Sequence, residues 1–161
     1  MKYLLVVLLL GTTFFATSQT IKLVISGVTE IAGETVIAFE TGDTTTVSFP
    51  GTGGMQVSAP RFEPIKIKKP FGTSTSELFR RSVGKMLIPE TVFQFHNASG
   101  ELYFSITLRE VVITHFSFLS PECINCASLV HQLWFHYNKI EWEDVAKGSI
   151  IRYDVRAVKF Y

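Results

Sequence analysis

The chain has 161 residues and a mass of 18.1 kDa, which allows one ordinary domain and excludes two. Its composition is 47% hydrophobic and 18% charged, which excludes intrinsic disorder, because disordered chains combine low hydrophobicity with high net charge. The net charge of +1 indicates no attraction to nucleic acid or to anionic lipid. The two cysteines are too few for a disulfide-dense mini-protein.

The first eighteen residues have the pattern of a secretory signal peptide. Lys2 gives an early positive charge, the apolar run Tyr3–Leu10 follows, and small side chains stand at Ala16 and Ser18, where signal peptidase requires them. The run is far shorter than the ~20 residues that a membrane-spanning helix needs, so no stable membrane insertion is expected. We therefore predict residues 1–18 as a signal peptide, export to the periplasm or beyond, and a single domain over residues 19–161.

Most of that domain has the composition and alternation of β-strands. Leu102, Phe104, Ile106 and Leu108 share one face of a run whose other face is mostly polar. The hydrophobic phase then shifts at Glu110-Val111, which predicts a bulge or bend. Strands are expected over residues 21–28, 34–40, 44–49, 64–70, 91–96, 101–118, 129–142 and 149–160.

One segment departs from the β pattern and predicts a helix over residues 75–86. Ser74 and Glu77 have the spacing of a capping box. Phe79, Val83 and Met86 then recur at helical spacing and are expected to form a buried stripe. The opposite face would leave Arg80, Arg81 and Lys85 in water. Short strands around a single helix predict a β-barrel or a β-sandwich.

The pair Cys123 and Cys126 is the one local motif with a chemical interpretation. A redox dithiol normally lies at a helix N-terminus, where the thiol pKa is lowered, and no helix is expected after this pair. A zinc site needs about four ligands, which this region does not supply. A structural disulfide between Cys123 and Cys126 is therefore the favoured interpretation, and a dithiol enzyme remains the alternative.

The other polar candidates show no catalytic spacing. His96, His115, His131 and His136 are scattered over three strands, and the acidic cluster around Glu141, Glu143 and Asp144 is typical of a solvated strand end. The sequence also lacks G-x-S-x-G, H-E-x-x-H and a Gly-rich phosphate loop. We therefore predict no catalytic residue, no cofactor and no metal.

Four stretches follow one another in an order and spacing that resemble a known family. They are residues 62–69 leading into 74–79, then Gly84–Glu90, then Leu102–Val112 with its acidic bend, and finally Leu133–Trp142, which ends in Lys-Ile-Glu-Trp. Together they are similar to the haemolysin-coregulated protein (Hcp) family, the tube proteins of type VI secretion.

The resemblance implies a compact β-barrel of two antiparallel sheets with one short helix and no catalytic residues. It also implies a homo-oligomer, a hexameric ring whose lumen carries protein cargo and which contacts components of the secretion apparatus. Family members assemble in the cytoplasm and normally lack a cleaved signal peptide, so the signal at residues 1–18 is a departure. Two alternatives stay open: a monomeric exported binding module on the same barrel, and a thiol oxidoreductase that uses Cys123 and Cys126.

Overall fold

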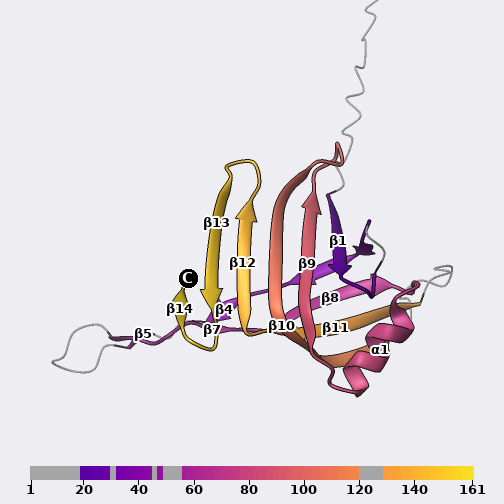
Figure 1. Ribbon diagram of the computed structural model, residues 1–161, viewed down its shortest axis with the longest axis horizontal. Helices are drawn as coiled ribbons and strands as arrows, with labels where there is room; N and C mark the ends of the chain where they lie inside the picture. Colours follow the sequence, from indigo (N-terminus) through magenta and orange to yellow (C-terminus); the bar gives the residue numbers. More distant parts are fainter. Residues whose placement is uncertain (1–18, 30–31, 45–46, 49–55, 120–128) are drawn as a thin grey trace, which may run out of the picture.

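The computed structural model describes residues 19–29, 32–44, 47–48, 56–119 and 129–161 (Figure 1). Its main strands are β1 (Thr20–Ile25), β2 (Glu34–Val36), β3 (Ala38–Glu40), β8 (Ile65–Pro70), β9 (Ile88–His96), β10 (Leu102–Leu119), β11 (Val130–His136), β12 (Lys139–Asp144), β13 (Ser149–Asp154) and β14 (Lys159–Phe160). Two-residue strands pair as β4 (Asp43–Thr44) with β7 (Arg61–Phe62) and as β5 (Val47–Ser48) with β6 (Gln56–Val57). The helix in the described residues is α1 (Thr75–Val83).

The main strands form two antiparallel sheets that share β10. The first sheet has the order β14-β13-β12-β10-β9-β1-β2, and the second has the order β10-β11-β8-β3. Figure 1 shows the first sheet as a row of upright strands, with β8 and β11 crossing beneath it and α1 at one end. The expected architecture, two antiparallel sheets with one short helix, is confirmed.

The sheets are continuous with each other at both margins, which closes the barrel. At one margin β10 pairs with β9 and β12 up to its bend and with β11 from Val112 onward. The bend is at Glu110, whose φ of 54° lies in the left-handed region, so the predicted bend is confirmed. At the other margin Ile37 alone separates β2 from β3, and its amide donates to the Lys68 carbonyl at 2.8 Å.

Two of the expected strands are each divided by a turn. Residues 129–142 form β11 and β12 around Tyr137 and Asn138, and residues 149–160 form β13 and β14. No Gly or Pro marks the first of these turns. Its polar groups are satisfied by other strands instead, because the Asn138 amide donates to Arg109 and the Asn138 carbonyl accepts from Val155. The sequence therefore predicted one strand over residues 129–142, because the alternation of hydrophobic residues continues across this turn and the turn itself depends on tertiary contacts.

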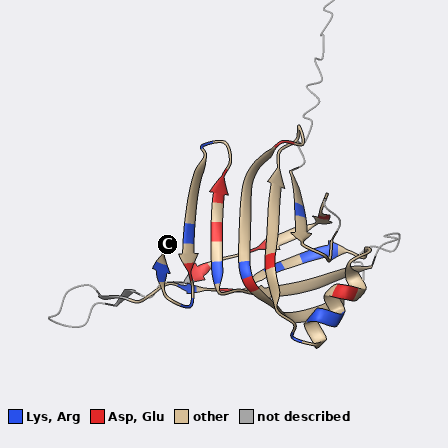
Figure 2. Ribbon diagram, viewed as in Figure 1, with Lys and Arg blue, Asp and Glu red and all other residues tan. Residues whose placement is uncertain are grey.

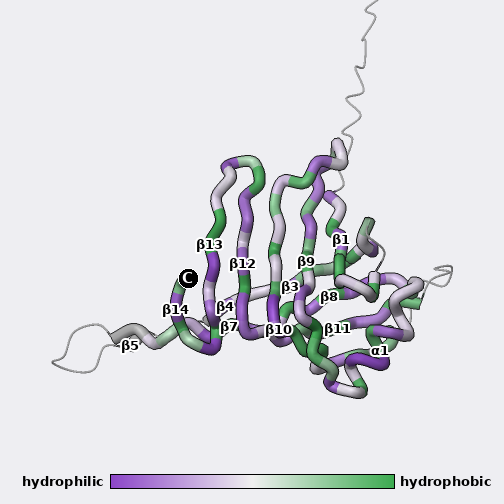
Figure 3. Tube along the Cα trace, viewed as in Figure 1, coloured by the Kyte–Doolittle hydropathy of each residue, from purple (hydrophilic) through white to green (hydrophobic). Residues whose placement is uncertain are grey.

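The barrel interior is filled by aliphatic and phenylalanine side chains. Figure 3 shows the alternation of hydrophobic and hydrophilic residues along β9, β10 and β12 that directs one face of each strand inward. Phe93 is fully buried, and its ring meets Phe39 and Phe135 edge-on at centroid distances of 5.0 and 5.7 Å. Other buried members of this core include Leu23, Ile25, Ile65, Ile67, Ile106, Leu108, Ile113, Leu133 and Ile140.

The helix begins at Thr75 as predicted, but its capping interaction and its C-terminal end differ from the expectation. Ser74 is the N-cap residue but makes no side-chain capping hydrogen bond, because its hydroxyl donates to Glu34. Glu77 binds Arg80 and Arg81 rather than the backbone, so the predicted capping box is wrong. The helix ends at Val83 instead of Met86, since Gly84 caps it.

The predicted buried stripe on the helix is also wrong. Leu78 is the fully buried helix residue, whereas Phe79 is 47% exposed and Val83 is 68% exposed. Met86 and Leu87, in the chain that follows, are exposed as well. Only one side of α1 packs, against β10, and the barrel core is filled without these four side chains. An amphipathic pattern therefore leaves an apolar surface on the outside of the molecule.

The positive φ of Glu110 at the β10 bend leads to a prediction about which substitutions the bend tolerates. The Glu110 carboxylate accepts hydrogen bonds from Asn138 at 2.8 Å and pairs with Lys139 at 3.3 Å, which holds a residue in a conformation that L-amino acids disfavour. We expect Glu110→Gly to be more stable than Glu110→Ala by about 1 kcal/mol, because glycine adopts positive φ without strain. Chemical denaturation of both variants measures this difference. Ala more stable than Gly would contradict it.

Candidate functional site

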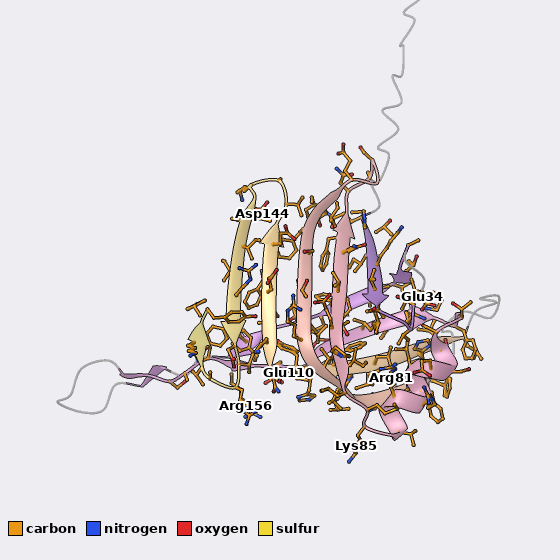
Figure 4. The ribbon with its side chains drawn as sticks, viewed as in Figure 1. Glu34, Arg81, Lys85, Glu110, Asp144 and Arg156 are labelled. Atoms are coloured by element: carbon orange, nitrogen blue, oxygen red, sulfur yellow. The ribbon has the colours of Figure 1, made fainter. Side chains whose placement is uncertain are left out.

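A buried ion pair ties three parts of the fold together beside α1. The Lys69 side chain, at the end of β8, is 1% exposed and lies 2.6 Å from the Glu34 carboxylate at the start of β2. The Glu34 carboxylate also accepts from the Ser74 amide and the Thr73 hydroxyl, both at 3.0 Å, and from the Ser74 hydroxyl. One carboxylate thus joins the first sheet, the second sheet and the residues that begin the helix, near the position labelled in Figure 4.

Two opposing effects act on the Glu34 carboxyl. Burial alone would raise its pKa, but hydrogen bonds from Lys69 and Ser74 outweigh burial and lower the pKa from 4.5 to about 2. The carboxylate is therefore ionised at neutral pH, and it is the counter-ion that allows Lys69 to be buried.

His131 lies directly across the strand pair from Lys69 and is fully buried. Its ring stacks on Phe116 at a centroid distance of 5.2 Å, and neither ring nitrogen has a hydrogen-bond partner within the described chain. Burial, with a smaller effect from the Lys69 charge, lowers the pKa of His131 from 6.5 to about 4. The neutral imidazole therefore behaves as one more aromatic ring.

The sequence analysis did not single out Glu34 or Lys69. A signal was present at Lys69, because Ile65, Ile67 and Lys69 occupy alternate positions and so share a strand face. A lysine in phase with buried isoleucines requires an acidic partner, although sequence alone does not identify Glu34.

Next to this cluster the helix presents an exposed apolar surface. We call it the helix patch and define it as Phe79, Val83, Met86 and Leu87. Phe79 touches the Phe116 ring edge-on at 5.3 Å, so the patch continues from the aromatic contacts of the barrel. Solvent exposure of a contiguous apolar surface is typical of a site that contacts another protein.

The expected basic face of the helix is only partly free. Arg80 and Arg81 both bind Glu77, each with a contact of 2.7 Å, so the one carboxylate offsets one of the two positive charges. Lys85 is exposed and takes part in no ion pair among the described residues. Figure 4 shows Lys85 beyond the C-terminal end of α1, pointing away from the barrel.

A second apolar surface lies at the other end of the molecule. It is a groove of about 420 Å³, named here the aromatic groove, and it is lined by Asp43, Pro60, Phe62, Trp142, Tyr153, Val158, Lys159 and Phe160. The Phe62 ring lies 4.9 Å from Tyr153, and the Tyr153 ring meets Phe160 at 5.0 Å. Phe160 is 71% exposed, so one wall of the groove is open to solvent.

The outer face of the first sheet is mostly polar across five strands, although Val24, Val92 and Ile150 also lie on it. We call it the polar face and define it as Lys22, Gln94, Ser105, Thr107, Glu141, Glu143 and Arg152, which lie side by side in the strand register. Figure 2 shows acidic residues of β12 beside a basic residue of β13. Glu141 pairs with Arg152 at 2.6 Å, and Ser105 donates to Glu143 at 3.1 Å.

The remaining sequence candidates are not brought together. Of the acidic cluster, Asp144 pairs with Lys147, and His131 and His136 lie on opposite faces of β11. Within the described ranges no group of three His, Cys, Asp or Glu side chains could hold a metal ion. The predicted disulfide Cys123–Cys126 and the predicted signal peptide, residues 1–18, lie outside the described residues. Among the described helical residues there is no stretch long and apolar enough to span a membrane.

The family model for "type VI secretion system effector, Hcp" matches residues 33–143. The chain therefore belongs to the Hcp family, as its sequence resemblance implied. The matched region contains the bend at Glu110, the helix and the strands that close the barrel. A search of curated proteins finds no significant match.

Solved structures support the same fold at low sequence identity. Hcp1 from Salmonella typhimurium is 16% identical with a TM-score of 0.72, and the match covers 89% of this chain and 99% of that one. A structure described as a type six secretion system protein is 11% identical with a TM-score of 0.77, covering 89% and 100%. Hcp1 from Flavobacterium johnsoniae is 14% identical with a TM-score of 0.62, covering 84% and 98%.

The buried ion pair generates a stability prediction. Glu34→Gln should lower the free energy of unfolding by about 3 kcal/mol, because it leaves the Lys69 ammonium buried without a counter-ion. Urea denaturation at pH 7 measures this loss. Glu40→Gln is the matched control: its pair with Lys66, at 2.7 Å, lies on the surface, so its loss should cost less than about 1 kcal/mol. Equal effects of the two variants would contradict the assignment.

The buried imidazole generates a pH prediction. Since the folded pKa of His131 is about 4 and the unfolded value is 6.5, the unfolded chain gains a proton first as the pH falls. The stability contributed by neutral His131 is complete above pH 6.5 and is lost progressively toward pH 4, by on the order of 3 kcal/mol. His131→Phe keeps a ring on Phe116 and should lose stability less steeply between pH 6.5 and 4.5, a window above most of the Glu34 titration. Parallel slopes would show that His131 does not titrate on unfolding.

Proposed function

We propose that this chain is a non-enzymatic structural subunit that forms hexameric rings of the type VI secretion tube type. The observation that carries the proposal is that a barrel with a complete core still exposes two apolar surfaces, the helix patch and the aromatic groove. Membership of the Hcp family agrees with a tube-like structural role. Apolar surfaces of this kind are used for contacts between protein chains.

The polar face is the surface we assign to the ring lumen. It carries two acidic and two basic side chains, Glu141, Glu143, Lys22 and Arg152, of which Glu141 and Arg152 pair, so it offers a hydrated wall without net charge. Such a wall accommodates protein cargo without adhering to it, because it presents neither a large apolar patch nor a field of one sign. Components of the secretion apparatus would then contact the ends of the ring.

Export is the second part of the proposal. Residues 1–18 act as a cleaved signal peptide, and residues 19–161 form one Hcp-like domain in the periplasm or outside the cell. In that oxidising space Cys123 and Cys126 are expected to form a structural disulfide. A ring assembled there is separated from a tube that polymerises in the cytoplasm.

The test is the native mass of the purified protein across a concentration series. Light scattering should give six times the chain mass, and mass spectrometry of the denatured protein should show cleavage after Ser18. A monomer at every concentration would contradict the ring and favour the monomeric binding module. In that case the aromatic groove would be the first place to look for a ligand.

A further inference from the structure

The two apolar surfaces have different shapes and lie at opposite ends of the molecule. The helix patch is a ridge of four side chains on and just after α1, whereas the aromatic groove is a hollow between β4, β7 and the last three strands. Figure 1 shows α1 and β14 at opposite ends of the barrel along the horizontal direction. A ridge and a hollow are complementary to each other in shape.

This arrangement selects one kind of contact between copies. A two-fold dimer uses the same surface on both partners, whereas a head-to-tail contact uses two different surfaces and leaves one of each free for the next copy. Head-to-tail contacts produce a ring when the rotation closes and a filament when it does not. Two unlike apolar surfaces at opposite ends of one chain are the surfaces that such a contact requires.

Charge supports the match. Asp43 is the carboxylate of the groove lining, and it is exposed and forms no ion pair within the described chain. Lys85, beside the helix patch, forms no ion pair with any residue that the structure describes. Lys159, which also lines the groove, carries the same positive charge as Lys85 and would repel it, so the favoured orientation places Lys85 beside Asp43 and away from Lys159.

We propose that the helix patch of one copy docks in the aromatic groove of the next copy, with Lys85 beside Asp43. The inference rests on the proposed ring and identifies the two surfaces that form each of its contacts. Val83 and Leu87 would enter the space bounded by Phe160, Trp142 and Tyr153. Phe160, the most exposed large hydrophobic side chain of the groove, is buried by this contact.

The experiment uses two variants that each remove one of the two surfaces. The helix variant carries Val83→Glu and Leu87→Glu, and the groove variant carries Phe160→Glu; these positions are exposed in the single chain. Val145→Glu is the matched control, because Val145 is an exposed apolar residue in the β12–β13 turn, away from both surfaces. Circular dichroism of each purified variant checks that the barrel is folded.

Each surface variant alone should be a monomer, while the wild type and Val145→Glu keep the mass of the ring. An equimolar mixture of the two surface variants should give a species of twice the chain mass. The intact patch of the groove variant still docks in the intact groove of the helix variant, and the chain of contacts ends there. A self-complementary interface does not produce this result.

The outcomes separate this inference from the proposed function. A monomeric wild type would overturn the ring and this contact with it. If the wild type forms a ring and either surface variant still has six times the chain mass, this contact is wrong and the ring is not contradicted. The same holds if the wild type forms a ring and the mixture of the two surface variants stays monomeric.

Charge reversal supplies a test that leaves the apolar surfaces intact. Lys85→Glu should raise the concentration at which half of the chains are in rings by about tenfold. Adding Asp43→Lys to the same chain should bring that concentration most of the way back to the wild-type value. Both side chains are exposed, so neither change disturbs the core. Failure of Asp43→Lys to restore assembly would contradict the pairing of these two residues.

Discussion

The Glu34–Lys69 pair is the interaction on which the closed end of the barrel depends. Lys69 enters the interior in phase with Ile65 and Ile67, and it can do so because Glu34 supplies an opposite charge at 2.6 Å. The same carboxylate holds the amide and hydroxyl of Ser74, so the position of α1 depends on a residue forty positions earlier. Removing either charge would leave the other buried and would release the start of the helix.

Burial of this pair also explains the state of its neighbour. With Glu34 and Lys69 balancing each other, His131 has no acidic partner of its own and remains a neutral ring stacked on Phe116. The aromatic contacts then continue outward through Phe116 to Phe79 and the helix patch. An electrostatic contact in the interior thus determines where an apolar surface is presented outside.

The strands were predictable from sequence because alternation is a local property. Phe104, Ile106 and Leu108 lie on the inward face as predicted, whereas Leu102 precedes a register shift and does not join the core. The break in phase at Glu110 located the bend where β10 passes between the sheets. The helix patch was not predictable in the same way: Val83 and Met86 have the spacing of a buried stripe, and only the completed barrel shows that the core is filled without them. The ion pair and the aromatic groove also needed tertiary structure, since Glu34 and Lys69, or Phe62 and Phe160, are far apart in the chain. The family resemblance was readable because it rests on the order of local stretches.

The sharing of β10 between both sheets has a consequence for how the chain acquires its structure. Strand β8 pairs with β11, so Ile65 cannot pair until Phe135 is available. The second half of β10 also has its pairing partner only when β11 is present. Most of the chain must therefore be available before the barrel closes, because the strands that close it are far apart in the sequence. The closed barrel can therefore form only once β11 has left the site of synthesis or translocation, because β11 joins β8 to β10.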